Sequence, residues 1–281
     1  MSALASPSGT MTGSRAGIYL EYLRISFQNM MAYRARYYVG VITYLIHVAV
    51  YYFIYRSLFG GAEGETSINR YSLSEMLTYV SIGWACKSFY LNYIDRDMAG
   101  DVRSGQIAMD LIKPIDLQWV HYAKGMGQSL FRLILFTPPV IIATAIMFEV
   151  SPPSSWPNLI LFSISTLLSA VIYLGINFLI GLAAVWFLSI EQILYSKNLM
   201  IELFSGLLIP IDWFPGWFQT LSSWLPFQAI AYVPLQIYLG RIDGSAAWQA
   251  IGMQLVWSLV LFIAGRMLWL ICQRKMLIQG G

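Results

Sequence analysis

The chain has 281 residues, of which 58% are hydrophobic and only 11% are charged, and its mean hydropathy is +0.62. Soluble proteins average about 25% charged residues, and a soluble domain of this size could not keep so much apolar surface away from water. The formal net charge of +3 comes from scattered basic residues without a basic stripe, which excludes nucleic acid as a partner. We therefore expect an all-α integral membrane protein with a single transmembrane domain over residues 17–281.

The N-terminal region divides into two parts. Residues 1–16 are rich in small polar residues and contain no apolar stretch of the kind that a cleavable signal needs, so we predict a disordered cytoplasmic tail. Over residues 17–34, Leu20, Leu23 and Phe27 recur at helical spacing. This pattern predicts an amphipathic helix that lies in the membrane surface, with an N-terminal extension of the first span as the alternative.

Six apolar segments are candidates for crossing the bilayer, which takes about 20 residues of helix. Pro138 and Pro139 interrupt the third segment, the fifth ends early at Pro210, and a short polar link at residues 191–198 precedes the fifth. We therefore expect six transmembrane helices. In chain order the six segments are residues 37–59, 73–94, 124–148, 158–190, 199–211 and 247–272.

Residues 212–240 fit neither a membrane span nor a soluble loop. They contain Trp213, Phe214 and Trp217, followed by further aromatic residues and several prolines. Two short helices that dip into the membrane from the outer side explain both features, because tryptophan favours the membrane interface and proline breaks helices. We expect this segment to form a re-entrant outer cap.

The distribution of lysine and arginine predicts the orientation. With the N-terminus inside, eleven basic residues lie on the inner side and three on the outer side, and this bias places both termini in the cytoplasm. The inner residues are Arg15, Arg24, Arg34, Arg36, Arg96, Arg103, Lys113, Lys124, Lys197, Arg274 and Lys275; the outer ones are Arg56, Arg70 and Arg241.

The sequence contains no constellation of residues that would support bond chemistry. His47 and His121 are far apart, and Cys86 and Cys272 lie in apolar stretches as small core residues. No set of His, Cys and carboxylate residues has metal-ligand spacing, and no G-x-x-x-x-G-K-[ST] motif is present. We therefore expect no enzyme activity and no cofactor bound by this chain, so any ATP that drives it must bind to another subunit.

The inner link at residues 95–123 is the most informative segment. Mixed charges precede a Ser-Gly pair, and a short apolar stripe follows and ends at a proline. A short helix here suits docking into a groove on a soluble partner, and a solvated loop with an incidental helix is the alternative. The residues that would form the docking surface are Asp101, Arg103, Ser104, Gly105, Ile107, Leu111 and Pro114.

Three motifs together resemble a known family. They are Arg103-Ser104-Gly105-Gln106-Ile107 with Leu111-Ile112-Lys113-Pro114-Ile115 in the link, Trp213-Phe214-Pro215-Gly216-Trp217 leading to Leu225-Pro226-Phe227 before the last span, and the basic tail Arg274 to Gly281. In this order, on a plan of six spans, they resemble the type-2 exporter permeases of the ATP-binding-cassette superfamily. The resemblance covers nearly the whole chain.

This resemblance implies partners and a mechanism. It implies two permease subunits, identical or related, joined to two cytosolic ATP-binding subunits that carry ATP and Mg. It also implies that the interfacial helix and the inner link contact the ATPases, and that the second and fifth spans line the translocation path. The outer cap of Trp213, Phe214 and Trp217 would close that path.

Ionisable residues inside spans are functional candidates by default. Lys87 in the second span and Glu202 in the fifth fall at similar depths in the inner half, so we hypothesise that they pair across an inner vestibule. Arg132 and Arg266 have a simpler alternative, because long cationic side chains can reach the headgroups. Next to Glu202, Ser205 and Gly206 suit either close helix packing or contact with substrate.

These expectations combine into one function. The chain would be the permease of an ATP-driven exporter that moves a hydrophobic or amphipathic substrate, such as a drug, natural product or lipid, out through the inner or plasma membrane of a bacterium. Two alternatives remain open: a permease for a lipid-linked glycan, and a membrane assembly or sensor subunit that does not transport.

Overall fold

The computed structural model describes residues 15–60, 67–148, 150–187 and 190–279, so the predicted tail lies outside it except for residues 15 and 16, which begin the first helix. Within these ranges the chain is helical, and its one β-type contact is a bridge between Ile68 and Tyr71.

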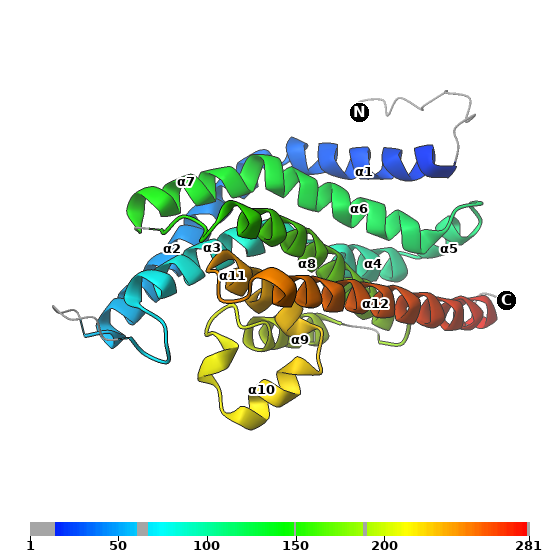
Figure 1. The fold of residues 1–281 in the computed structure, drawn as a ribbon. Helices are drawn as coiled ribbons and strands as arrows, with labels where there is room; N and C mark the ends of the chain where they lie inside the picture. Colours follow the sequence, from blue (N-terminus) through cyan, green and yellow to red (C-terminus); the bar gives the residue numbers. More distant parts are fainter. Residues whose placement is uncertain (1–14, 61–66, 149, 188–189, 280–281) are drawn as a thin grey trace.

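Figure 1 shows long helices running side by side, with shorter ones at their ends. The first seven α-helices are α1 (Arg15–Ala32), α2 (Arg34–Leu58), α3 (Leu73–Tyr90), α4 (Ile94–Arg103), α5 (Gln106–Leu111), α6 (Leu117–Phe131) and α7 (Thr137–Met147). The others are α8 (Trp156–Leu182), α9 (Glu191–Phe204), α10 (Gly216–Ser223), α11 (Tyr232–Tyr238) and α12 (Gly244–Gln279), with short 3-10 turns at Ala183–Val185, Ile211–Trp213 and Phe227–Ala229.

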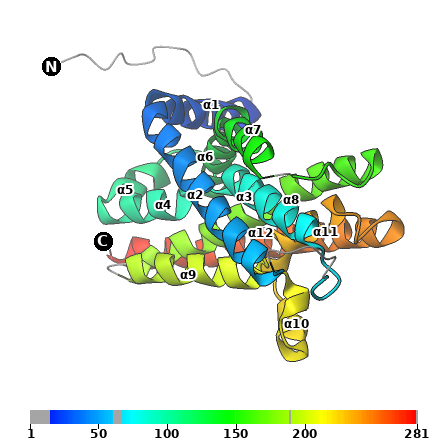
Figure 2. The ribbon, with the colours of Figure 1, turned by 90° about the vertical axis from the view of Figure 1, so that its left-hand side faces the viewer.

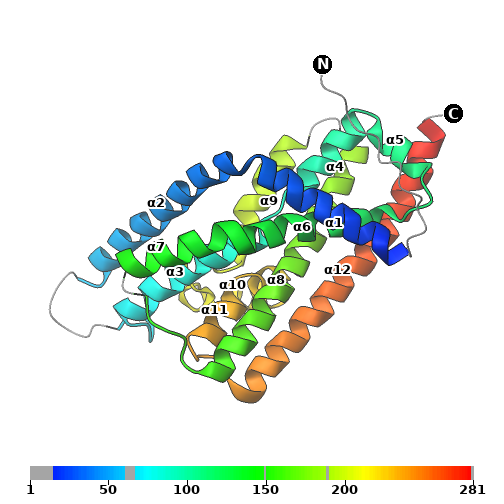
Figure 3. The ribbon, with the colours of Figure 1, turned by 90° about the horizontal axis from the view of Figure 1, so that it is seen from above.

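Helix α1 confirms that residues 17–34 are mostly helical, and it packs along α6, as Figure 3 shows from above; its place in the membrane surface stays a prediction. Gly127 on α6 permits this close approach, because a Cβ atom there would lie 2.3 Å from the Leu23 carbonyl oxygen. Ser26 donates a hydrogen bond of 2.8 Å to the Lys124 carbonyl. Leu20, on the predicted apolar stripe, is exposed, so α6 does not cover this residue.

Four helical stretches are long and apolar enough to cross a membrane: Tyr38–Leu58, Leu117–Met147, Trp156–Val185 and Gly244–Arg274. The expected count of six is not confirmed by length and composition. The second predicted span, α3, has 18 residues and carries Glu75 and Lys87, and the fifth, α9, has 14 residues. Helix α9 is too short, and α3 is too polar, to be recognised as a membrane span by length and composition. Helix α3 is nevertheless buried along most of its length between other helices.

Several predicted boundaries were wrong by about two turns, and the reasons are local. Helix α6 begins at Leu117 rather than after the inner link, because the Asp116 side chain accepts hydrogen bonds from the backbone N–H groups of Gln118 and Trp119. The last seven residues of the predicted link therefore belong to a helix. Likewise, the predicted polar link 191–198 forms the first half of α9, which ends at Phe204.

The predicted interruption by Pro138 and Pro139 takes the form of a π-helical turn. Residues Arg132–Phe136 form this turn, and the Thr137 N–H bonds to the carbonyl of Arg132. The prolines follow directly, within the first turn of α7. A helix tolerates proline in its first turn, because the backbone N–H groups there are not needed for hydrogen bonds within the helix. The turn lets α6 and α7 continue as one long element in Figure 1.

The core of the molecule lies around α8, which packs against α12, α4, α11 and α3. Gly175 and Gly181 of α8 face Leu261 and Met98 so closely that a Cβ atom would lie within 3 Å of each. Small residues at such contacts are typical of packed membrane helices. Figure 2 shows α10 standing off from this body, below α11 and the end of α2.

Candidate functional site

The site begins where the chain leaves the helical path between α3 and α4. Leu91 takes an extended conformation, and the backbone stays irregular until α4 begins at Ile94. Irregular backbone at membrane depth needs polar partners from the protein. Gln128 of α6 accepts a hydrogen bond from the Tyr93 N–H at 2.9 Å, and Asn177 of α8 donates one of 3.0 Å to the Asn92 carbonyl. Two amide side chains in neighbouring helices thus stabilise the break.

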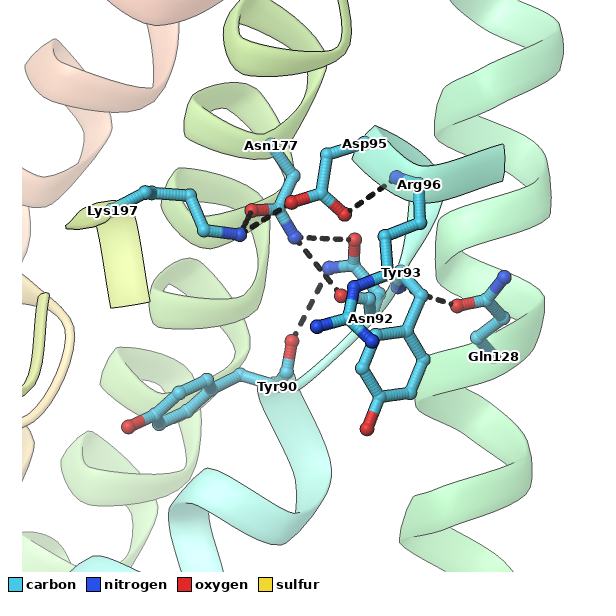
Figure 4. Close-up of polar contacts among 8 residues, drawn as sticks. All are labelled: Tyr90, Asn92, Tyr93, Asp95, Arg96, Gln128, Asn177 and Lys197. Atoms are coloured by element: carbon cyan, nitrogen blue, oxygen red, sulfur yellow. Dashed lines mark hydrogen bonds and ion pairs between the residues drawn. The ribbon is translucent and has the colours of Figure 1, made fainter. Parts of the chain in front are cut away.

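An ion pair between Asp95 and Lys197 lies at the centre of this network, as Figure 4 shows. The two charged groups are 2.5 Å apart, and their side chains are only 2% and 6% exposed. Lys197 also donates to the Asn177 side-chain oxygen at 2.7 Å, and the second carboxylate oxygen of Asp95 accepts from the Arg96 backbone N–H. A buried pair of this kind is tolerated because each charge has further hydrogen-bond partners. It joins α4, α8 and α9 at one point.

A second ion pair, between Lys87 of α3 and Glu202 of α9, lies nearby. The Lys87 ammonium also lies 4.3 Å from the centre of the Trp84 ring, a cation–π contact. The contact hypothesised from the sequence is therefore present in the structure. Its role in stabilising a closed or assembled state stays a prediction.

Both ion pairs line one cavity of about 280 Å³. Its wall combines these four charged side chains with aromatic rings, so it offers both polar and apolar contacts. The aromatic residues of the wall are Tyr44, Trp84, Tyr90, Tyr93 and Tyr173, and His47 also borders it.

The predicted docking residues fall on α4, α5 and the turn between them. Asp101 lies 4.0 Å from Lys124 of α6. Burial raises the pKa of Asp101 above its ordinary value, and the positive charge of Lys124 partly opposes that shift. Arg103 lies 3.9 Å from Glu191, where α9 begins. Ser104 and Gly105 form the turn, and Gly105 has a φ of +73°, a conformation that favours glycine.

The apolar stripe of the link does not face outward as predicted. Ile107 is buried in a core cluster with residues of α4, α8 and α12, and Leu111 packs against the same cluster. Pro114 is exposed, and so is Ile112, at 79%. Any partner that docks here would therefore contact Ile112 and the charged groups, while Ile107 holds the link against the membrane helices.

Ser205 and Gly206 do not line the cavity and instead end helix α9. Gly206 has a φ of +74°, and its carbonyl accepts a hydrogen bond of 2.5 Å from the Tyr79 hydroxyl. The Ser205 carbonyl accepts from the Tyr232 backbone N–H at 2.9 Å. These contacts favour the packing interpretation of the two small residues over contact with substrate.

The arginines predicted inside spans differ from each other. Arg132 is buried, with its guanidinium 5.4 Å from the ring centres of both Tyr93 and Phe136, so it does not reach toward headgroups. Arg266 is partly exposed and pairs with Asp116 at 2.5 Å. The alternative of a cation that extends to the headgroups thus fails for Arg132.

The predicted outer cap divides into a partly buried and an exposed part. Trp213 packs its ring edge-on against Tyr55 and Tyr71, whereas Phe214 stacks on Phe218 of α10 at 4.3 Å. Trp217, also on α10, is largely exposed.

A polar network lies beside this cap. Asp212 accepts hydrogen bonds from the hydroxyls of Tyr71 at 3.0 Å and Tyr232 at 2.6 Å. Arg241 pairs with Glu75 at 3.1 Å, and its guanidinium lies 3.6 Å from the centre of the Tyr71 ring. Ring contacts and hydrogen bonds therefore attach the cap to α2 and to Tyr71, which lies just before α3.

Sequence reasoning identified Lys87 and Glu202 but missed the central pair of Asp95 and Lys197. Both residues were assigned to polar links outside the spans, since their helix boundaries were misplaced. Asn177 was the signal that could have found them, because it is a buried amide deep within a long apolar helix. In the described ranges, no group of three or more His, Cys, Asp or Glu side chains is placed to hold a metal ion.

Comparison with known proteins identifies one family. The family model described as "ABC-2 family transporter protein" matches residues 45–280, which include the inner link, both ion pairs and the outer cap. No curated protein matches the chain.

Proposed function

The chain belongs to the ABC-2 family and is a membrane-embedded permease subunit of an ABC transporter, and from this premise we propose that it is the permease of an exporter for an amphipathic or hydrophobic substrate. The observation that carries the proposal is the buried Asp95–Lys197 pair, which joins the inner link to the wall of the cavity. Movement of α4 by a docked ATPase would reach α9 through this pair. Aromatic rings beside charged groups in the cavity suit a substrate that has both apolar and polar parts.

In this proposal the ATP-binding subunits supply the energy. Two of them would bind ATP and Mg, and two permease subunits would assemble around one path. The permease itself would bind no cofactor. Helix α1 and the link formed by α4 and α5 would contact the ATP-binding subunits on the cytoplasmic side of the membrane.

The proposal includes a topology of six crossings with both termini inside. The four long apolar helices supply four crossings, and α3 and α9 would supply the other two inside the assembly, where protein covers their polar groups. The excess of basic residues on the N-terminal side supports this orientation. Helices α10 and α11 would be the re-entrant helices of the outer cap, in the inner or plasma membrane of a bacterium.

Co-purification tests the proposed function. The tagged full-length chain, purified from its native membrane, should retain an ATPase with a Walker motif, and amphipathic compounds should change the rate of ATP hydrolysis. If the wild-type chain retains no ATP-binding subunit, the proposal is wrong.

A matched pair of variants tests where the ATPase docks. Ile112 in the link and Ile146 near the end of α7 are both 79% exposed, but they lie at opposite ends of the molecule. We expect Ile112→Ser to reduce the retained ATPase several-fold and Ile146→Ser to leave it unchanged. Equal retention by both variants would contradict docking at the link.

A further inference from the structure

Three ion pairs join α9 to the α3–α4 segment within the described residues. Arg103 pairs with Glu191 at 3.9 Å, Asp95 with Lys197 at 2.5 Å, and Lys87 with Glu202. Read along the chain, α3 and α4 present a positive, a negative and a positive group at 87, 95 and 103. Helix α9 presents a negative, a positive and a negative group at 191, 197 and 202, which are all of its charged residues. The two segments therefore pair in antiparallel order with alternating signs.

This alternation makes the pairing depend on register. If α9 shifted by one pair, moving along its axis and turning with its own helical pitch, Lys197 would face Lys87, or Glu202 would face Asp95. Adjacent pairs on α9 are five or six residues apart, so such a slide covers roughly 8 Å at about 1.5 Å per residue. Every such shift brings like charges together, and the middle position is buried, where like charges repel strongly.

The three pairs differ in burial along the segment. The side chains of Arg103 and Glu191 are more than half exposed, those of Asp95 and Lys197 are almost fully buried, and those of Lys87 and Glu202 lie between these limits at the cavity. The exposed pair alone would contribute little, since surface pairs are weak. The order of the charges matters more than the strength of any single pair.

We propose that these three ion pairs form a charge ladder that holds α9 in one register against α3 and α4, so that α9 follows the inner link by tilting with it and not by sliding past it. Asp95, Lys197, Lys87, Glu202, Arg103 and Glu191 are then positioning residues. The role of this coupled movement in transport rests on the proposed function. The register itself does not, so the two ideas fail in different experiments.

A variant with uniform charges tests the ladder while it leaves the buried pair intact. This variant combines four substitutions: Lys87→Glu, Arg103→Glu, Glu202→Lys and Glu191→Arg. The α3–α4 segment is then negative at 87, 95 and 103, and α9 is positive at 191, 197 and 202. Every pair remains attractive in the native register, but every shifted register is attractive as well. Nothing in the charge order would then select one register.

Distances between spin labels report the register directly. Tyr195 on α9 is 79% exposed and Met109 on α5 is 60% exposed, so each can be replaced by a labelled cysteine in full-length protein whose buried Cys86 and Cys272 have been changed to alanine. The doubly labelled protein is diluted with unlabelled protein in lipid nanodiscs and measured by pulsed electron paramagnetic resonance. We expect one distance for the wild-type ladder and a second population, displaced by several ångströms, for the uniform-charge variant. A single wild-type distance in that variant would overturn the proposal.

Two further variants keep the test decisive. Inverting only the exposed pair, with Arg103→Glu and Glu191→Arg, carries little risk of misfolding and should give a smaller second population. Inverting Asp101 and Lys124, which join α4 to α6 and not to α9, should leave the single distance unchanged. If this control broadens the distances as much as the ladder variants do, charge inversion acts generally and the ladder is refuted. If the wild-type chain retains no ATPase during co-purification, the proposed function is wrong, but the distances between the spin labels do not depend on that result.

Discussion

The two ends of the protein, which we propose to be the inner and the outer end, stabilise irregular backbone in different ways. At the inner end, the break between α3 and α4 is held by amide groups and by the buried Asp95–Lys197 pair. At the outer end, tyrosine hydroxyls hold Asp212 beside the cap. Both ends contain irregular backbone that lipid could not satisfy.

The difference shows which end is suited to respond to a partner. A buried ion pair loses much of its stabilisation when its partners separate, so helices joined by such pairs tend to move together. Tyrosine hydroxyls and packed rings around Asp212 instead attach the cap through several weaker contacts. We therefore interpret the inner end as the coupled part of the protein and the outer end as the anchored part.

The largest expected effect comes from Lys197→Met. This change leaves the Asp95 carboxylate buried without its counter-ion, and removing one partner of a buried pair costs about 3–5 kcal/mol. Thermal unfolding of the purified full-length protein should show a large drop in the midpoint temperature.

A double variant separates charge from packing at this position. Asp95→Asn combined with Lys197→Met removes both charges and keeps an amide oxygen that can accept from the Arg96 N–H. It should recover most of the lost stability. If the double variant is as unstable as Lys197→Met alone, an uncompensated charge is not the cause.

An intermediate effect is expected at the outer end from Gly206→Ala. The left-handed conformation costs an alanine roughly 1–2 kcal/mol, and a Cβ atom would lie 3.0 Å from Ile211 and 3.1 Å from Tyr232, which adds about 1–3 kcal/mol of crowding. The matched control is Gly105→Ala, which has the same left-handed φ but no atom within 4 Å of the added Cβ. Equal unfolding temperatures for the two variants would show that the outer end is less tightly packed than its contacts indicate.

The smallest expected effect is a gain in stability from Asp97→Asn on α4. Burial raises the pKa of Asp97 above its ordinary value, although the hydrogen bond from Gln128 opposes this shift. The folded protein therefore binds a proton at Asp97 more readily than the unfolded chain, and this group contributes more stability as the pH falls toward its raised pKa. Asparagine is neutral and can still accept from Gln128, so the midpoint temperature at neutral pH should rise on the order of 2 °C.

The pH dependence provides the check on this prediction. The wild-type protein should gain stability from Asp97 as the pH falls from neutral toward the raised pKa of this group, and the variant should lack that part of the gain. A variant whose pH profile is parallel to that of the wild type would show that Asp97 does not titrate differently on folding.

Agreement between sequence and structure was best where the physical cause is local. The spacing of Leu23 and Phe27 predicted the helix α1, and the apolar length of α8 and α12 predicted two long apolar helices. Agreement was poorest at residues such as Ile107, which the link pattern placed on a docking surface and the structure buries. Whether an apolar side chain on a short helix faces a partner or its own chain depends on what packs against it.

The sequence by itself determined that this chain is a helical membrane protein, because composition and apolar length limit how a chain can meet lipid. It also pointed to Lys87 and Glu202 through their depth. Only the tertiary structure decided that Asp95, Asn177 and Lys197 meet, and that the charges of α9 alternate against those of α3 and α4. The three ion pairs join residues about 90 to 115 positions apart in the chain, and no local periodicity encodes which helix faces which.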